Sequence, residues 1–146
     1  PFGLESDNAE TGTIHRLWNR RQCTYFNGAS NISQAGGLMA LSEEGRKECR
    51  TLVDYYLGNA AIIKEGLEKA GLVCYGGVNS PYVWAKAPRG MGSWEFFDFL
   101  LEKAHVVVTP GEGFGKSGEG YVRVSSYGHR EDVEKAVKAI VEHIND

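Results

Sequence analysis

A glycine-rich turn followed by an arginine-bearing strand is the part of the chain whose residue types point to chemistry. Five glycines fall between residues 111 and 120, and residues 121–125 then alternate as a strand does. On that strand Arg123 stands between two valines, where a guanidinium is costly to bury unless it meets an anion. The arginine fork matches a carboxylate through two parallel hydrogen bonds. The pattern predicts that Arg123 binds a substrate carboxylate at the mouth of a mobile loop.

Two phosphate-binding motifs overlap this loop, and neither fits. Residues 113–118 match G-x-G-x-x-G, but that fingerprint needs a following helix whose N-terminus holds the pyrophosphate, and a strand follows here. Gly115-Lys116-Ser117 resembles the end of a P-loop, yet the first glycine of that motif would fall on Pro110. Lys116 is therefore interpreted as a solvated loop lysine.

Composition narrows the class of protein. The chain has 146 residues, 42% of them apolar and 24% charged, which is typical of one globular domain. A net charge of −3 with scattered signs gives no nucleic-acid footprint, and no apolar run approaches a membrane span. The three cysteines, Cys23, Cys49 and Cys74, fit neither a metal site nor a disulfide framework, so we expect free and mostly buried thiols in a reducing compartment.

Hydrophobic periodicity and capping residues predict the elements. We expect helices over residues 13–22, 31–41, 43–70, 93–103 and 130–144, and strands over 72–75, 82–87, 106–109 and 121–125. Ser93 is the expected N-cap of its helix, whose buried side would carry Trp94, Phe97, Leu100 and Leu101. This order predicts an α+β fold, a small mixed or antiparallel sheet with helices packed on one side.

Several segments of the sequence resemble one known family. They are Leu17–Gln22, Phe26–Asn31, Gln34–Gly36, Pro81–Trp84 and the loop and strand from Pro110 to Ser125. Together they resemble the C-terminal part of class I/II, fold-type I aminotransferases that depend on pyridoxal phosphate, most closely the LL-diaminopimelate aminotransferases. The resemblance implies that residues 1–41 are a remnant of the large cofactor-binding domain and the interdomain connection. Residues 42–146 would be the C-terminal small domain.

The resemblance also implies roles for individual residues. Arg123 matches the arginine that binds the amino-acid α-carboxylate, and Asn27 matches an asparagine at the cofactor and substrate, where two subunits meet. Gly111, Phe114 and Gly115 match the loop before the arginine strand. The family's Schiff-base lysine lies upstream in a Ser-x-x-Lys motif, and none of the eight lysines here has that context. We therefore expect no catalytic residue in this chain, and we expect pyridoxal 5'-phosphate in the parent enzyme but not covalently bound here.

The expected parent function is amino transfer between LL-diaminopimelate or tetrahydrodipicolinate and glutamate or 2-oxoglutarate, in lysine biosynthesis. The expected partners are amino-acid and 2-oxo-acid substrates, the missing large domain and a second subunit of a homodimer, in the cytoplasm or a plastid stroma. The chain begins at Pro1 and looks like a piece of something longer, inactive alone.

Alternatives stay open for the whole chain and for both site residues. The parent could be a class I/II aminotransferase for another amino acid, or the chain could be a non-enzymatic binding or dimerisation domain. For Arg123 the alternative is a surface ion pair with Glu119, and for Asn27 it is a turn asparagine that bonds its own backbone.

Overall fold

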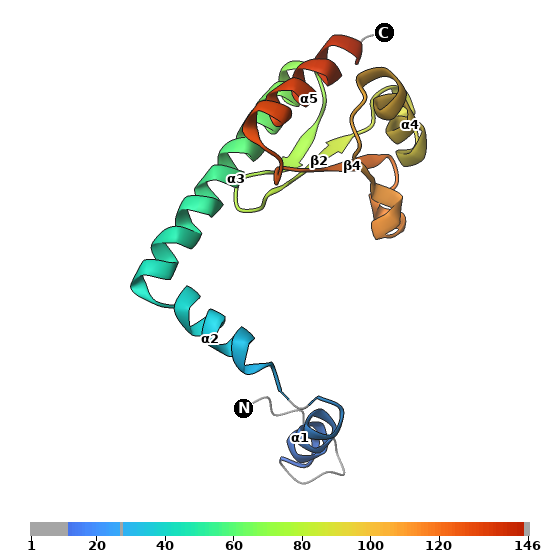
Figure 1. Cartoon of the computed structure of the whole chain (residues 1–146). Helices are drawn as coiled ribbons and strands as arrows, with labels where there is room; N and C mark the ends of the chain where they lie inside the picture. The colour runs from blue at the N-terminus through green and yellow to red at the C-terminus, as the bar shows by residue number, and fades with distance from the viewer. Residues whose placement is uncertain (1–11, 27, 145–146) are drawn as a thin grey trace. The chain divides into compact units, whose positions relative to one another are not determined.

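The computed structural model describes residues 12–26 and 28–144, and the chain divides into two compact units. The first unit spans residues 1–47 and includes α1 (Thr13–Tyr25), α2 (Asn31–Ala40) and the start of α3 (Glu43–Lys69). The second spans residues 48–146 and contains the rest of α3, the sheet and two further helices (Figure 1).

The described residues of α1 and α2 have no buried core. The Ser30 hydroxyl accepts a hydrogen bond from the Ser33 N–H at 3.2 Å and so caps the start of α2. The helix α1 continues to Tyr25, beyond the expected end at residue 22. No residue of either helix is buried. Their exposed large apolar side chains are Ile14, Leu17, Trp18, Tyr25, Ile32, Leu38 and Met39.

The long helix α3 begins and ends close to the residues that the sequence predicts. The Gly45 N–H donates to the Ser42 hydroxyl at 3.1 Å, and Glu43 and Glu44 favour the positive end of the helix dipole. The helix stops at Lys69, and Gly71 adopts a φ of +88°, a left-handed conformation that an L side chain resists.

The sheet has four antiparallel strands in the order β1-β2-β4-β3. Their bounds are Cys74–Gly76 for β1, Tyr82–Lys86 for β2, Thr109–Pro110 for β3 and Tyr121–Ser125 for β4. The strand expected over residues 106–109 is therefore displaced and short. Its physical reason is local: the Val106 N–H donates to the Leu100 carbonyl at 3.1 Å, which ties this segment to a helix end instead of the sheet.

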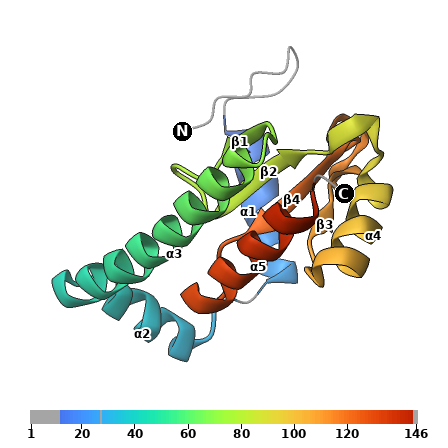
Figure 2. The same ribbon diagram turned by 90° about the horizontal axis from the view of Figure 1, so that it is seen from above.

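Three helices of the second unit pack on one face of the sheet, as the predicted fold class requires. They are α3, α4 (Ser93–Ala104) and α5 (Arg130–His143), and Figure 2 shows α3 and α5 side by side across the strands. Gly66 lets α3 and α5 approach closely, because a Cβ atom added there would collide with Val137. The core joins Val83 and Val122 of the sheet to Leu67, Phe96 and Ile140 of the helices.

Two details of α4 differ from the sequence-based prediction. The buried residues of this helix are Ser93, Phe96, Leu100 and Ala104, whereas Trp94 and Leu101 are exposed. Its N-cap is Gly92, not Ser93, because the Ser93 hydroxyl is engaged elsewhere. The cysteine prediction was also partly wrong, since Cys23 and Cys49 are exposed and only Cys74 is buried.

Strand register assigns the remaining sheet face to polar and aromatic side chains. In the middle of the sheet Arg123 lies opposite Trp84 on one side and Thr109 on the other, so these three side chains share a face. Tyr82 and Tyr121 are two residues removed along their strands and lie on that face too. We call this surface the aromatic face. It carries the site.

Candidate carboxylate-binding site

Arg123 lies on the central strand β4, half-buried on the aromatic face. Its Nε nitrogen is buried without a hydrogen-bond partner, and within residues 12–26 and 28–144 the guanidinium makes no ion pair or hydrogen bond. A buried N–H without a partner costs about 1–3 kcal/mol, and more for a charged group. The guanidinium is therefore placed to receive an anion that this part of the chain does not provide.

Two aromatic rings flank this guanidinium. Its central carbon lies 4.3 Å from the centroid of the Tyr82 ring and 4.3 Å from that of the Phe114 ring. Both distances are inside the range in which an aromatic face attracts a cation. Tyr82 comes from β2, while Phe114 comes from η2 (Gly111–Phe114), a short 3-10 turn in the glycine-rich loop. Sequence reasoning missed this arrangement, because no local pattern shows that two separate segments meet at one arginine.

The glycine-rich loop folds tightly onto itself and so fixes Phe114. A Cβ atom added at Gly111 would collide with the Gly118 carbonyl oxygen, and one added at Gly118 would collide with that of Gly111. Gly115 has a φ of +113°, which an L side chain rarely adopts. The glycines are needed for this close approach of backbone to backbone, and not for holding a phosphate.

The surface ion pair weighed for Arg123 is not formed. Glu119 accepts a hydrogen bond from the Ser93 N–H at 3.0 Å, so its carboxylate caps the start of α4. The Ser93 hydroxyl donates to the Gly118 carbonyl at 3.1 Å and lies 3.3 Å from the Tyr121 N–H, which donates to it. These bonds attach the glycine-rich loop to α4 and leave Arg123 without an acidic partner among the described residues.

A shallow recess of about 380 Å³ adjoins Phe114 on the aromatic face. Trp84 lies 5.4 Å from Phe114 between ring centroids and 6.5 Å from Tyr121, and Ser117 supplies a hydroxyl group to the lining. The residues that line it are Tyr75, Trp84, Phe114, Ser117, Gly118 and Tyr121. No charged side chain lines the recess, but two cations lie opposite its aromatic wall in register, Arg123 opposite Trp84 and Lys86 opposite Tyr121.

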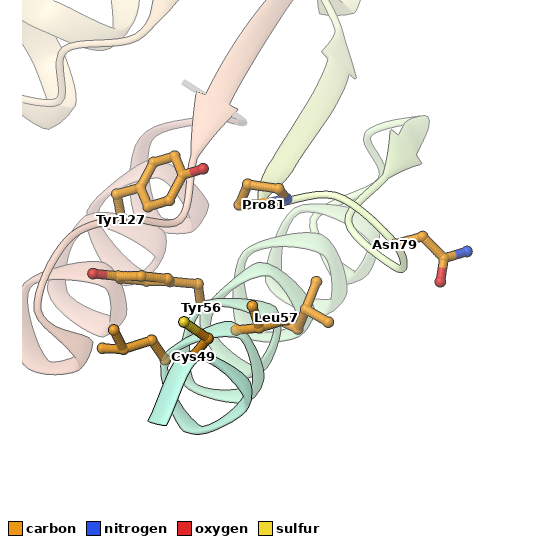
Figure 3. Close-up of a pocket in the computed structure, with 8 residues that line it drawn as sticks. Cys49, Tyr56, Leu57, Asn79, Pro81 and Tyr127 are labelled. Atoms are coloured by element: carbon orange, nitrogen blue, oxygen red, sulfur yellow. The ribbon is translucent and has the colours of Figure 1, made fainter. Parts of the chain in front are cut away.

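A larger recess of about 460 Å³ lies on α3 and does not include Arg123. Figure 3 shows Cys49, Tyr56 and Leu57 on the helix, with Tyr127 and Pro81 on the two segments that face it. None of its lining residues is charged, so it offers a carboxylate no cationic partner. Tyr127 connects the two regions, because its ring lies 4.9 Å from Tyr56 and 5.8 Å from Tyr82.

Of the other two predicted positions, Lys116 is described by the structure and Asn27 is not. Asn27 lies outside the described residues, so its predicted role at cofactor and substrate stays a prediction. Lys116 is exposed on its loop, as expected for a solvated lysine. His129 is the N-cap residue of α5. The Tyr55 hydroxyl accepts a hydrogen bond from the Arg130 N–H at 2.8 Å, which satisfies one backbone donor at the start of that helix.

The lysines of the chain do not make an anchor for pyridoxal phosphate. All eight are described and none is buried. Lys69, Lys135 and Lys138 pair with acidic residues on their own helices, and their side chains are between 75 and 78% exposed. A nucleophilic lysine is instead activated in a desolvated site, where its pKa falls. None of the eight lysines therefore has the environment of a Schiff-base lysine, and no chemical step through the cofactor follows from the described residues.

Among residues 12–26 and 28–144, no three or more His, Cys, Asp and Glu side chains gather as ligands for a metal ion. No helix in the same residues combines the length and the apolar character that crossing a membrane requires.

Comparisons with known proteins place the chain in one family. The family described as aminotransferase class I and II matches residues 13–140. LL-diaminopimelate aminotransferase of Prochlorococcus marinus strain NATL2A is 54% identical over 132 residues, covering 90% of this chain and 32% of the relative. The enzyme of the same name from Bacteroides fragilis is 52% identical over 127 residues, covering 87% of this chain and 31% of the relative.

Solved structures give the same likeness. L,L-diaminopimelate aminotransferase from Chlamydomonas reinhardtii superposes with a TM-score of 0.89 at 44% identity, over 97% of this chain and 34% of that one. Substrate-bound BacF from Bacillus subtilis has a TM-score of 0.74 at 32% identity, over 92% of this chain and 34% of the other. The chain thus spans about a third of the length of the relatives it matches.

Proposed function

Because the chain belongs to the class I and II aminotransferase family, we propose that it is the C-terminal part of an LL-diaminopimelate aminotransferase and supplies its carboxylate-binding arginine. The observation that carries this proposal is the unpaired guanidinium of Arg123, flanked by two rings at 4.3 Å. Both an amino donor and a 2-oxo-acid acceptor present an α-carboxylate, so one arginine serves both half-reactions.

The rest of the proposal concerns what the longer protein would contribute. Residues 1–41 would be the remnant of the large domain and residues 42–146 the small domain. The exposed apolar side chains of α1 and α2 support this division, because a face of that kind needs a cover. Pyridoxal phosphate, the lysine that binds it and a second subunit would come from outside this chain. Asn27 would lie at the cofactor and substrate, where the two subunits meet. The compartment would be cytoplasmic or stromal.

Relatives at 54% and 52% identity carry one enzyme name, which favours this substrate over that of another class I/II aminotransferase. The same identity does not favour a non-enzymatic dimerisation domain.

A chimera tests the proposal. The C-terminal part of the Prochlorococcus marinus enzyme is replaced by this chain over the matched 132 residues, and transamination of LL-diaminopimelate with 2-oxoglutarate is measured. We expect activity near that of the intact enzyme. Arg123→Lys should lower kcat/KM by roughly ten- to a hundredfold, because a charge-assisted hydrogen bond contributes about 1.5–3 kcal/mol. Arg123→Ala should lower it further for donor and acceptor alike.

Cofactor content separates the possible failures. A chimera that binds pyridoxal phosphate and transaminates other amino acids, but not LL-diaminopimelate, shows that the substrate is wrong. A chimera in which Arg123→Ala keeps the parent rate for both substrates shows that the carboxylate role is wrong.

A further inference from the structure

We propose that Tyr82 and Phe114 are positioning residues, whose rings hold the guanidinium of Arg123 so that its N–H edge faces an incoming carboxylate. The inference rests on the proposed carboxylate role of Arg123. It adds two residues that act through the arginine and need no contact with the substrate. It concerns only the second unit, where all three residues lie.

Each ring is supported independently of the other. Tyr82 lies at the start of β2, and its ring lies 5.8 Å from that of Tyr127. Phe114 is held by the closed glycine-rich loop, and its ring lies 5.4 Å from that of Trp84. The two aromatic neighbours of Arg123 are thus fixed by different elements, and the guanidinium is held by both.

Hydrogen bonds hold the turn that contains Tyr127, the residue whose ring contacts Tyr82. Asn59 of α3 is fully buried, and its amide donates to the carbonyls of Ser126 and Gly128 at 3.1 and 3.0 Å. These two bonds fix the residues on both sides of Tyr127. A chain of contacts therefore runs from the buried Asn59 through Tyr127 to the ring of Tyr82.

The chemistry of a guanidinium explains why flanking rings favour carboxylate binding. The group is planar, and its hydrogen bonds leave from its edges, while aromatic rings attract it through its faces. Rings that contact a guanidinium through its faces therefore do not compete with an anion for its N–H groups. They also restrict the rotamers of a long side chain, so that less freedom is lost when a carboxylate binds.

The surroundings of Arg123 agree with a guanidinium that contacts rings and leaves its N–H groups for an anion. The nitrogen that is buried without a partner is Nε, and no acidic side chain among the described residues pairs with the guanidinium. A guanidinium held only by rings is oriented without being neutralised. An arginine whose role was a structural ion pair would instead have a carboxylate partner in the same unit.

Nuclear magnetic resonance on the full 146-residue chain tests the inference without cofactor or turnover. The Arg123 Nε–Hε signal is assigned by its loss in Arg123→Lys, and its order parameter is measured in the parent chain and in Phe114→Leu, Tyr82→Leu and Tyr82→Phe. The same signal is followed while sodium acetate is added, with sodium chloride as the ionic-strength control. Trp94→Leu is the matched control, because Trp94 is 56% exposed, contacts Phe97, and lies over no cation of the described residues.

The expected result is a rigid side chain in the parent, with an Nε order parameter near the value of about 0.85 typical of rigid backbone. Both leucine variants should fall below about 0.6, the range of flexible groups, and should bind acetate about two- to tenfold more weakly. Tyr82→Phe keeps the ring and should match the parent, as should Trp94→Leu. Thermal midpoints measured in parallel identify any variant whose fold has changed.

Two outcomes overturn different parts of the reasoning. Leucine variants that keep both the parent order parameter and the parent acetate affinity overturn the positioning role of the rings. A parent chain whose Arg123 signal is rigid but does not respond to acetate overturns the carboxylate role on which the proposed function depends. The first result leaves the proposed function standing, and the second leaves the restraint by the rings standing.

Discussion

Removing the amide of Asn59 should destabilise the second unit by an amount that its contacts allow us to work out. The side chain is fully buried, and its Nδ2 group donates to two backbone carbonyls that belong to the turn after β4. A typical intramolecular hydrogen bond adds about 0.5–1.5 kcal/mol net, and a buried group left without its partner costs about 1–3 kcal/mol. Asn59→Leu, which keeps the volume, should therefore lower the free energy of unfolding by about 2–4 kcal/mol.

The Oδ1 atom of the same side chain reduces that loss. It is buried without a partner, as is the Ser126 hydroxyl oxygen, so the leucine variant also removes one unsatisfied acceptor. Asn59→Asp is the harsher change at neutral pH, because a carboxylate placed against two carbonyl oxygens can only accept. Protonation restores one donor, so the aspartate variant should regain part of its stability as the pH falls below its raised pKa.

Urea unfolding of the full chain, followed by far-ultraviolet circular dichroism, measures these changes. Asn79→Leu is the control, because Asn79 is exposed and no hydrogen bond of its side chain occurs among the described residues. If Asn59→Leu lies within about 0.5 kcal/mol of the parent, as surface substitutions usually do, the two bonds do not hold the turn. The support that we assign to Tyr127 would then need another source.

Three further predictions follow from other parts of the chain. Burial raises the pKa of the Cys74 thiol to about 11, with Glu68 acting in the same direction, so a thiol reagent at pH 8 should label Cys23 and Cys49 quickly and Cys74 only on unfolding. Because that raised pKa favours protons on the folded chain, stability should fall as pH rises from about 9 to about 11, and Cys74→Ala should remove this part of the fall in pH-dependent unfolding. Gly111→Ala should displace the loop and weaken acetate binding to the chain, whereas Gly113→Ala, where a Cβ meets open space, should bind acetate as the parent does.

The elements with local signals could be predicted from the sequence. The cap at Ser42 and the stop at Gly71 set the ends of α3, and both follow from the chemistry of single residues. The alternation around Arg123 predicts β4 because one face of that strand is buried and the other is not. Such signals depend on a few neighbouring residues, so tertiary packing does not alter the structure that they predict.

The buried side of α4 could not be assigned in this way. Its apolar residues are almost continuous, so they match helical spacing on more than one face. Of the predicted buried residues Leu100 is buried, together with Phe96, whereas Trp94 and Leu101 are exposed. What decides between the faces is the attachment of Ser93 and Glu119 to each other and to the glycine-rich loop, which joins positions about 25 residues apart in sequence.

The site also combines a local signal, which the sequence shows, with contacts between distant residues, which it does not. An arginine between two valines signals an unusual environment for charge, which is a local fact and needs no structure. Its neighbours are set by strand register and loop closure, which bring Tyr82 from about 40 residues before Arg123 and Phe114 from about ten residues before it. The sequence therefore predicts a carboxylate ligand for Arg123, and the fold brings two aromatic rings to its guanidinium. A substitution at either ring should for that reason alter carboxylate affinity while leaving the charge and the strand intact.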